Sequence, residues 1–169
     1  MASLATSADL VVTGHVVASE ATKEHPTYDS DDPELNPYAG RDDAPTDEEI
    51  EAAAIVVTTH TVEVESVLGR RSGIDIEPGA EIRVVEAGGV FNGVTHEVPG
   101  IGLLERGDGP LLFLARGEHD YYVVGLDQGK FIADETGNFT SVAEGRTDLT
   151  AHPDELGDTQ RLLDTSEGR

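Results

Sequence analysis

The amino-acid sequence predicts an all-β protein built as a small closed or partly open barrel. Short segments alternate between apolar and polar residues with a period of two, which is the spacing of a half-buried strand. Gly, Pro and Asp separate these segments, and almost no stretch has convincing helical spacing. Gly14 lies within the first strand segment and indicates a bend, a bulge or a close crossing of another strand, as is needed where a small barrel turns a corner.

The clearest local structure is predicted in residues 110–133, PLLFLARGEHDYYVVGLDQGKFIA. Two apolar runs, residues 111–114 and 121–124, are rich in aromatic and branched side chains. The connector between them, residues 116–120, contains Gly117 and Asp120. This arrangement predicts an antiparallel hairpin on which the earlier strands pack.

The remaining strands are predicted from the same alternation. Residues 9–19, 52–68 and 80–86 form three strands, and residues 131–132 and 139–142 a final small hairpin. In the second strand one face collects the side chains predicted to point inward: Val56, Thr58, His60, Val62 and Val64. Three successive strands, a long Gly-rich connection and a hairpin are typical of an OB-type barrel. The Cys–Trp–Cys pattern of immunoglobulin sandwiches is missing.

A long acidic insert separates the first two strands. Residues 21–51 are rich in Pro and Asp, and residues 20–51 hold 12 acids and 2 bases. Such a segment cannot bury much apolar surface, so we expect a solvated loop. Near its end, Thr46 and Glu49 have the spacing of a helix-capping pair.

Composition limits the class of function. The 169-residue chain has a formal net charge of −23 and only two lysines, which disfavours nucleic-acid binding. It has no Cys, hence no disulfide or thiolate metal site, and no apolar run long enough to span a membrane. We expect a monomer with one barrel domain at residues 1–146. Residues 147–169 are expected to be a polar tail, disordered or forming a short helix.

Four segments resemble a group of small exported envelope proteins of bacteria, of an actinobacterial type. They are ADLVVTGHV (residues 8–16), HTVEVESVLG (60–69), PGAEIRVVEAGG (78–89) and PLLFLARGEHDYYVVGLDQGKF (110–131). The same strand pattern is distantly similar to the OB barrel of netrin-like modules and tissue inhibitors of metalloproteinases. Together these segments cover about two-thirds of the chain and omit the acidic insert and the tail.

The resemblance implies a protein that is extracytoplasmic or secreted, with an export signal that this sequence does not contain. A cytoplasmic location is the alternative. Netrin-like modules rely on disulfides and an N-terminal Cys, and this chain has neither. A metalloproteinase-inhibitor function is therefore not carried over.

Candidate binding residues come from two segments. The turn that follows the main hairpin predicts that Gln128 and Phe131 are presented to a ligand, while Phe91 and His96 belong to the Gly-rich residues 88–102. The Gly-rich residues 88–102, together with the acidic insert, form the predicted contact surface. In the alternative interpretation the turn is structural and Phe131 plugs the end of the barrel.

No motif of a hydrolase, metalloprotease or cofactor-binding enzyme is present, and we expect no cofactor. The sequence therefore favours a non-enzymatic binding or interaction module whose partner is another envelope protein or a small ligand. The alternative is a metal-dependent hydrolase that uses His60, His96 and His119. His60 on its apolar strand face is more simply explained as a core histidine.

Overall fold

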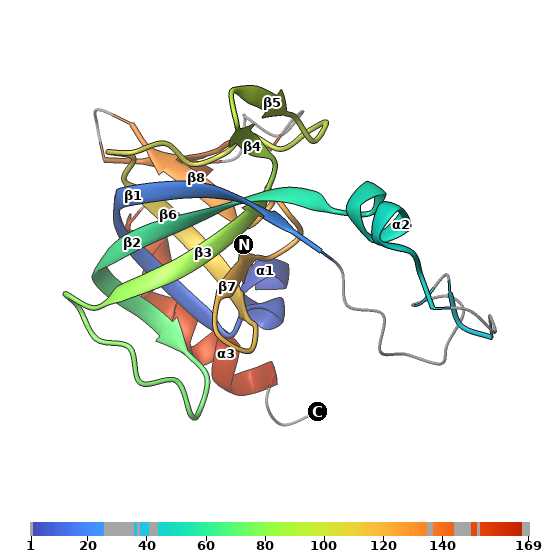
Figure 1. Cartoon of the computed structure of the whole chain (residues 1–169). Helices are drawn as coiled ribbons and strands as arrows, with labels where there is room; N and C mark the ends of the chain where they lie inside the picture. The colour runs from blue at the N-terminus through green and yellow to red at the C-terminus, as the bar shows by residue number, and fades with distance from the viewer. Residues whose placement is uncertain are drawn as a thin grey trace.

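Five strands close into a barrel in the computed structural model (Figure 1). Their order around the barrel is β1-β2-β3-β7-β6, and pairing of β6 with β1 completes the circle. All neighbours are antiparallel except β3 and β7, which are parallel. The structure describes residues 2–25, 36, 38–40, 44–134, 137–143, 150–151 and 153–166. The predicted all-β barrel of the OB type is confirmed.

The barrel strands are β1 (Leu10–Glu24), β2 (Ile55–Arg70), β3 (Glu81–Ala87), β6 (Pro110–Arg116) and β7 (Tyr121–Val123). Between β3 and β6 a separate hairpin is formed by β4 (Gly89–Phe91) and β5 (Val94–His96). The sheet is extended beyond β6 by β8 (Lys130–Ala133), β9 (Phe139–Ser141) and β10 (Thr150–Ala151). The two predicted hairpins, β6–β7 and β8–β9, are both confirmed.

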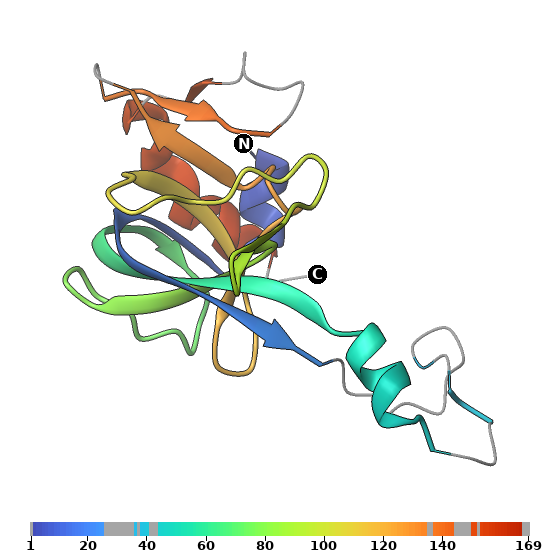
Figure 2. The same ribbon diagram turned by 45° about the horizontal axis from the view of Figure 1, so that its top comes forward.

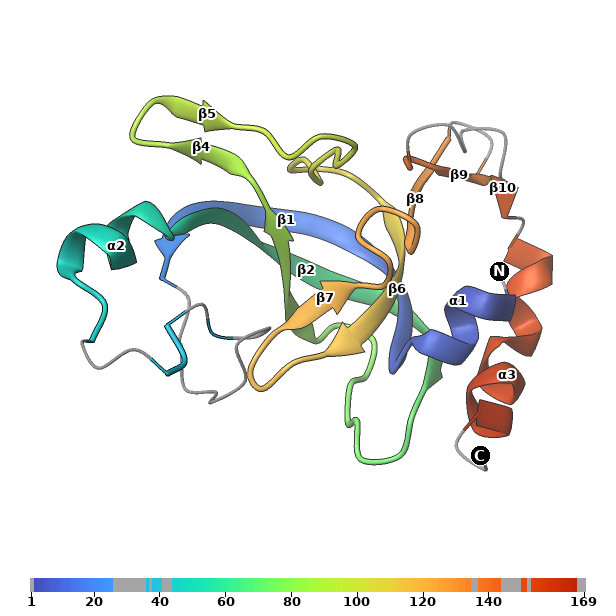
Figure 3. The ribbon, with the colours of Figure 1, turned by 90° about the vertical axis from the view of Figure 1, so that its right-hand side faces the viewer.

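Alternation along the strands builds two hydrophobic cores rather than one. Leu10 and Val12 of β1 point into the barrel, where they pack with Leu112 and other interior residues. Val11, between them, points outward and packs with Phe113 and the helical residues of a second core. Helices α1 (Ala2–Ser7) and α3 (Thr159–Ser166) lie side by side over this outer face (Figure 3). Both faces of the β1–β6 wall are therefore buried.

Residues 153–166, in the segment predicted to be a polar tail that is disordered or forms a short helix, are helical and pack onto the barrel. Its 3₁₀ helix η1 (Pro153–Asp158) and α3 contribute Leu156 and Leu163, which are both buried. The side-chain amide of Gln160 binds the backbone of Arg70 at the end of β2. Its oxygen accepts from Arg70 N–H at 2.9 Å, and its nitrogen donates to Arg70 O at 3.0 Å. The sequence allowed for a short helix here, but the spacing of its three Leu residues alone does not show that the helix packs against the barrel.

The end of the acidic insert forms helix α2 (Asp47–Ala52), beyond the ends of β1 and β2 (Figure 2). The predicted capping pair is confirmed: Thr46 Oγ1 accepts from Glu49 N–H, and the Glu49 carboxylate accepts from Thr46 N–H at 2.8 Å. Residues 26–35, 37 and 41–43 of the insert lie outside the described residues. None of the helices in the described part is long and apolar enough to cross a membrane.

Gly14 lies where β1 approaches the backbone of β2 closely. A methyl group built on its Cα would lie 2.3 Å from the backbone oxygen of Glu63, and the β1–β2 register shifts between Thr13 and Gly14. The predicted close crossing at this residue is therefore confirmed. It lets β1 bend sharply enough to pair with both β2 and β6.

We expect Gly14→Ala to lower the free energy of unfolding by at least about 1–3 kcal/mol, because the neighbouring atom is rigid backbone. Gly157→Ala is the matched control, since a methyl group there meets no atom within 4 Å. Urea denaturation measures both. Equal stability of the two variants would contradict the assigned crossing.

Candidate functional site

Four ionisable side chains are buried together at one end of the barrel interior. His60 and Lys130 are each 1% exposed, Glu86 6% and Asp127 4%. His60 lies at an inward-facing position of β2. Glu86 lies on β3, on the same inward face as Ile82 and Val84. Burying a charge is costly unless it is paired and hydrogen-bonded, so the contacts of this charged cluster decide its stability.

Lys130 is the centre of the charged cluster. Its ammonium lies 2.5 Å from Glu86 Oε1 and 2.9 Å from Asp127 Oδ1, and it donates a hydrogen bond to Gly102 O. The two carboxylates also accept backbone donors: Gly102 N–H binds Asp127 Oδ2 at 2.8 Å, and Leu104 N–H binds Glu86 Oε2 at 2.9 Å. The charged cluster therefore fastens residues 102–104 across the barrel end.

His60 connects this cluster to a surface serine. Its Nδ1 lies 2.8 Å from Ser19 Oγ, and its Nε2 lies 3.0 Å from Glu86 Oε2, outside hydrogen-bond alignment. Burial raises the pKa of Glu86, but the contacts with His60, Lys130 and Leu104 N–H together outweigh burial. They hold the pKa of Glu86 below its ordinary value.

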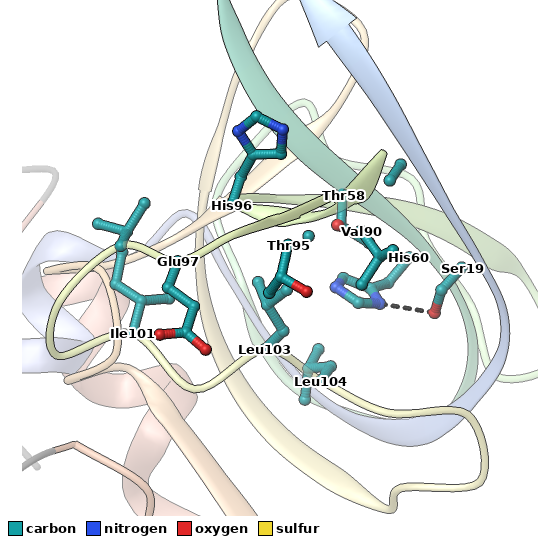
Figure 4. A pocket seen from close by; sticks show the side chains of 13 residues that line it. Ser19, Thr58, His60, Val90, Thr95, His96, Glu97, Ile101, Leu103 and Leu104 are labelled. Atoms are coloured by element: carbon teal, nitrogen blue, oxygen red, sulfur yellow. Dashed lines mark hydrogen bonds between the residues drawn. The ribbon is translucent and has the colours of Figure 1, made fainter. Parts of the chain in front are cut away.

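A cavity of about 410 Å³ opens beside Ser19 and His60 (Figure 4). It lies between β1 and β2 on one side and the β4–β5 hairpin with residues 97–104 on the other. Its lining combines apolar side chains, including Val90 and Leu103, with polar ones such as Thr95 and His96. A mixed cavity at the mouth of a barrel is a common setting for small-molecule binding.

A second, more apolar groove of about 210 Å³ runs along the outer face of β2, β3 and β7. Five large apolar side chains are exposed among the described residues, and three of them line this groove: Ile55 (55%), Tyr122 (47%) and Leu126 (66%). Val57 and Val85, which are buried, also line it. An exposed apolar patch of this kind marks an interaction site more often than a chance arrangement.

Leu126 is also conformationally strained. Its φ is +62°, and it follows Gly125 at +64°. The left-handed region costs a residue with a Cβ about 1–2 kcal/mol. Leu126 is two-thirds exposed, so burial of its side chain does not offset this cost. Strain at an exposed apolar residue is a signature of a functional position.

The four predicted binding residues separate in the structure. His96 is exposed and lines the cavity, Phe91 is half-buried on β4, and Gln128 is exposed in the turn beside Leu126. Phe131 is only 2% exposed and packs edge-to-face against Phe113, with ring centroids 6.0 Å apart. Phe131 therefore neither meets a surface ligand nor plugs the barrel end, because it belongs to the outer core.

The three histidines of the predicted metal alternative do not form a site. His60 is a buried core histidine, and His96 lines the same cavity, but His119 is exposed in the β6–β7 connection and does not line it. Within the described ranges, no group of three or more His, Asp or Glu side chains could hold a metal ion.

Comparison of the chain with protein-family models, curated proteins and solved structures finds no match in any of the three. Functional inference therefore depends on the cavity, the charged cluster and the groove.

We expect Glu86→Gln to reduce the free energy of unfolding by about 3–5 kcal/mol at pH 7, because Lys130 loses one of its two carboxylate partners. Glu86 has a lowered pKa in the folded state, so its contribution is complete above its ordinary value of 4.5 and is lost as pH falls through the lowered value. The stability difference between wild type and variant should therefore shrink between pH 6 and pH 3, measured by urea unfolding.

Glu81→Gln is the control on the same strand, because Glu81 is exposed. It should follow the wild-type curve. A gap between wild type and Glu86→Gln that stays constant with pH would contradict the role assigned to Glu86.

Proposed function

We propose that the protein is an extracytoplasmic binding module that holds a segment of a partner polypeptide in the groove beside Leu126. The main observation behind this proposal is that three exposed apolar residues, Leu126, Tyr122 and Ile55, line one apolar groove, and that the backbone of Leu126 is strained. Burial under a partner would remove apolar surface from water at all three residues, which favours association.

The size of the groove supports a polypeptide segment over a free small molecule. At about 210 Å³ it is smaller than the roughly 300–1,000 Å³ typical of small-molecule pockets. It suits one or two apolar side chains of a longer chain that continues over the neighbouring surface. Ile101, from the Gly-rich segment, closes one side, and Glu24 and Ile55, at the two ends of the acidic insert, contribute to its wall.

Charge supports a cationic partner. Glu24 lines the groove, and the nearby basic side chains are already paired: Lys23 and His25 with Glu51, and Arg83 with Asp120 at 2.7 Å. The whole chain carries −23, which attracts positive and repels negative partners. The proposed ligand is a segment with apolar anchors flanked by Lys or Arg, and holding it needs no covalent chemistry or cofactor.

The location outside the cytoplasm is supported by the resemblance of the four strand segments to exported envelope proteins. The partner is then another protein of the cell envelope. Monomeric protein with a free groove is the form that would meet such a partner.

The test compares two synthetic peptides, one of alternating Leu and Lys and one of alternating Leu and Glu, by fluorescence anisotropy. The Leu–Lys peptide should bind and the Leu–Glu peptide should not. Leu126→Asn should weaken binding at least about tenfold, in line with the loss of an interface hot spot. Because Asn tolerates the left-handed conformation, the melting temperature should stay equal or rise.

Val94→Asn is the matched control, since Val94 is also exposed but does not line the groove. It should bind the Leu–Lys peptide as the wild type does. Equal binding of both peptides, or unchanged binding by Leu126→Asn, would contradict the proposed function.

A further inference from the structure

We infer that Ser19 is an activated nucleophile in the cavity at the barrel mouth, with His60 as its general base and Glu86 as the residue that orients His60. The activity assigned is hydrolysis of small uncharged carboxylic esters through an acyl-serine intermediate. This inference goes beyond the proposed binding function. Ser19 and His60 do not line the groove beside Leu126, whereas Glu86 and Ile101 border both the groove and this site.

A β-bulge places Ser19 at this position. In the β1–β2 register Val16 pairs with Val62, but Ala18 pairs with Thr61, so Val17 is an extra residue. The extra residue reverses which side chains of β1 face inward, and Ser19 becomes the direct partner of His60. Bulges often redirect a side chain next to an active site. Without the bulge, Ser19 would face away from His60.

The contacts of His60 determine which ring nitrogen carries the proton in its neutral form. Glu86 Oε2 lies 3.0 Å from Nε2, outside hydrogen-bond alignment, and a carboxylate can only accept, so its negative charge favours the tautomer with the proton on Nε2. Nδ1 is then an acceptor, and the Ser19 hydroxyl, 2.8 Å away, donates to it. Serine, histidine and carboxylate therefore have the relative roles of a hydrolase triad, which is recognised by geometry and not by sequence order.

The charged cluster keeps this arrangement rigid. Glu86 is held by Lys130 through one carboxylate oxygen and by Leu104 N–H through the other. Its lowered pKa keeps it ionised, so that it stabilises the imidazolium formed when His60 takes a proton. His60 is buried and cannot be solvated, whereas Ser19 is exposed and can be reached by a substrate.

The cavity defines the substrate class. Figure 4 shows Ser19 and His60 at one side of a space that Val90, Ile101 and Leu103 line from other sides. Its volume of about 410 Å³ is suited to a short acyl group and a small leaving group. Because the protein carries −23, an anionic ester is repelled and an uncharged one is favoured. Thr95 and His96 also line the cavity and supply polar contacts.

The reaction is balanced by water alone. Ser19 Oγ forms a bond to the carbonyl carbon and gives its proton to His60 Nδ1, while the carbonyl π electrons move to oxygen. Collapse of this intermediate breaks the bond to the leaving alcohol, which takes the proton from Nδ1. Water then attacks the acyl-serine with His60 again as base, and the products are a carboxylic acid and free Ser19.

The experiment treats the folded full chain with a fluorophosphonate probe and with p-nitrophenyl butyrate. Intact mass should show one phosphonyl group per chain, and peptide mapping should place it on Ser19. The ester should release p-nitrophenolate with an initial burst. Ser19→Ala should abolish labelling and lower ester turnover at least about 100-fold, as expected for loss of an activated nucleophile.

Ser66→Ala is the control, because Ser66 is a half-buried serine of β2 outside the cavity, and it should react like the wild type. His60→Gln should lose labelling; if it does not fold, Ser19→Cys tests the base, since iodoacetamide should alkylate Cys at position 19 faster than a cysteine introduced at Ser66. Absence of labelling of the wild type, or labelling that maps elsewhere, would overturn the inference and leave the peptide-binding result untouched.

Discussion

The ammonium group of Lys130 lies inside the barrel, and the architecture of the barrel mouth depends on neutralising it. Two carboxylates and a backbone carbonyl surround it, and the same carboxylates accept the N–H groups of Gly102 and Leu104. The Gly-rich connection is thereby drawn over the end of the barrel. His60 is placed against the same carboxylate, so one buried charge organises the connection, the histidine and the cavity wall.

The β1–β6 wall of the barrel packs against a hydrophobic core on each of its two faces. β1 and β6 supply alternate side chains to an interior core and to an outer core under α1 and α3. α3 reaches only the Gly69–Arg70 end of β2, and in the described part of the chain no helix packs extensively on β3 or β7, where the apolar groove remains exposed. The position of the exposed groove thus follows from where the covering helices are placed.

Sequence patterns predicted the barrel because alternation is a local property of each strand. The hairpins, the inward face of β2 and the capped helix α2 all follow from spacing within a few residues. Alternation could not place Ser19 opposite His60, because the bulge at Val17 leaves no local signal in the sequence. Glu86 shares a strand face with Ile82 and Val84, but its burial was not predicted, because its partners come from β8 and from a loop far along the chain. Leu126 was missed because backbone strain depends on the turn it occupies.

β8 joins the two cores through adjacent residues. Lys130 points into the barrel mouth, and Phe131, next to it, points into the outer core against Phe113. A slip of β8 by a single residue along β6 would place an ammonium group among hydrocarbon side chains and an aromatic ring between carboxylates. A pairing of β8 with β6 in the wrong register is thus destabilised at both residues, because Lys130 would enter an apolar environment and Phe131 a charged one. The three oxygen atoms that contact the Lys130 ammonium therefore help to fix the register of β8.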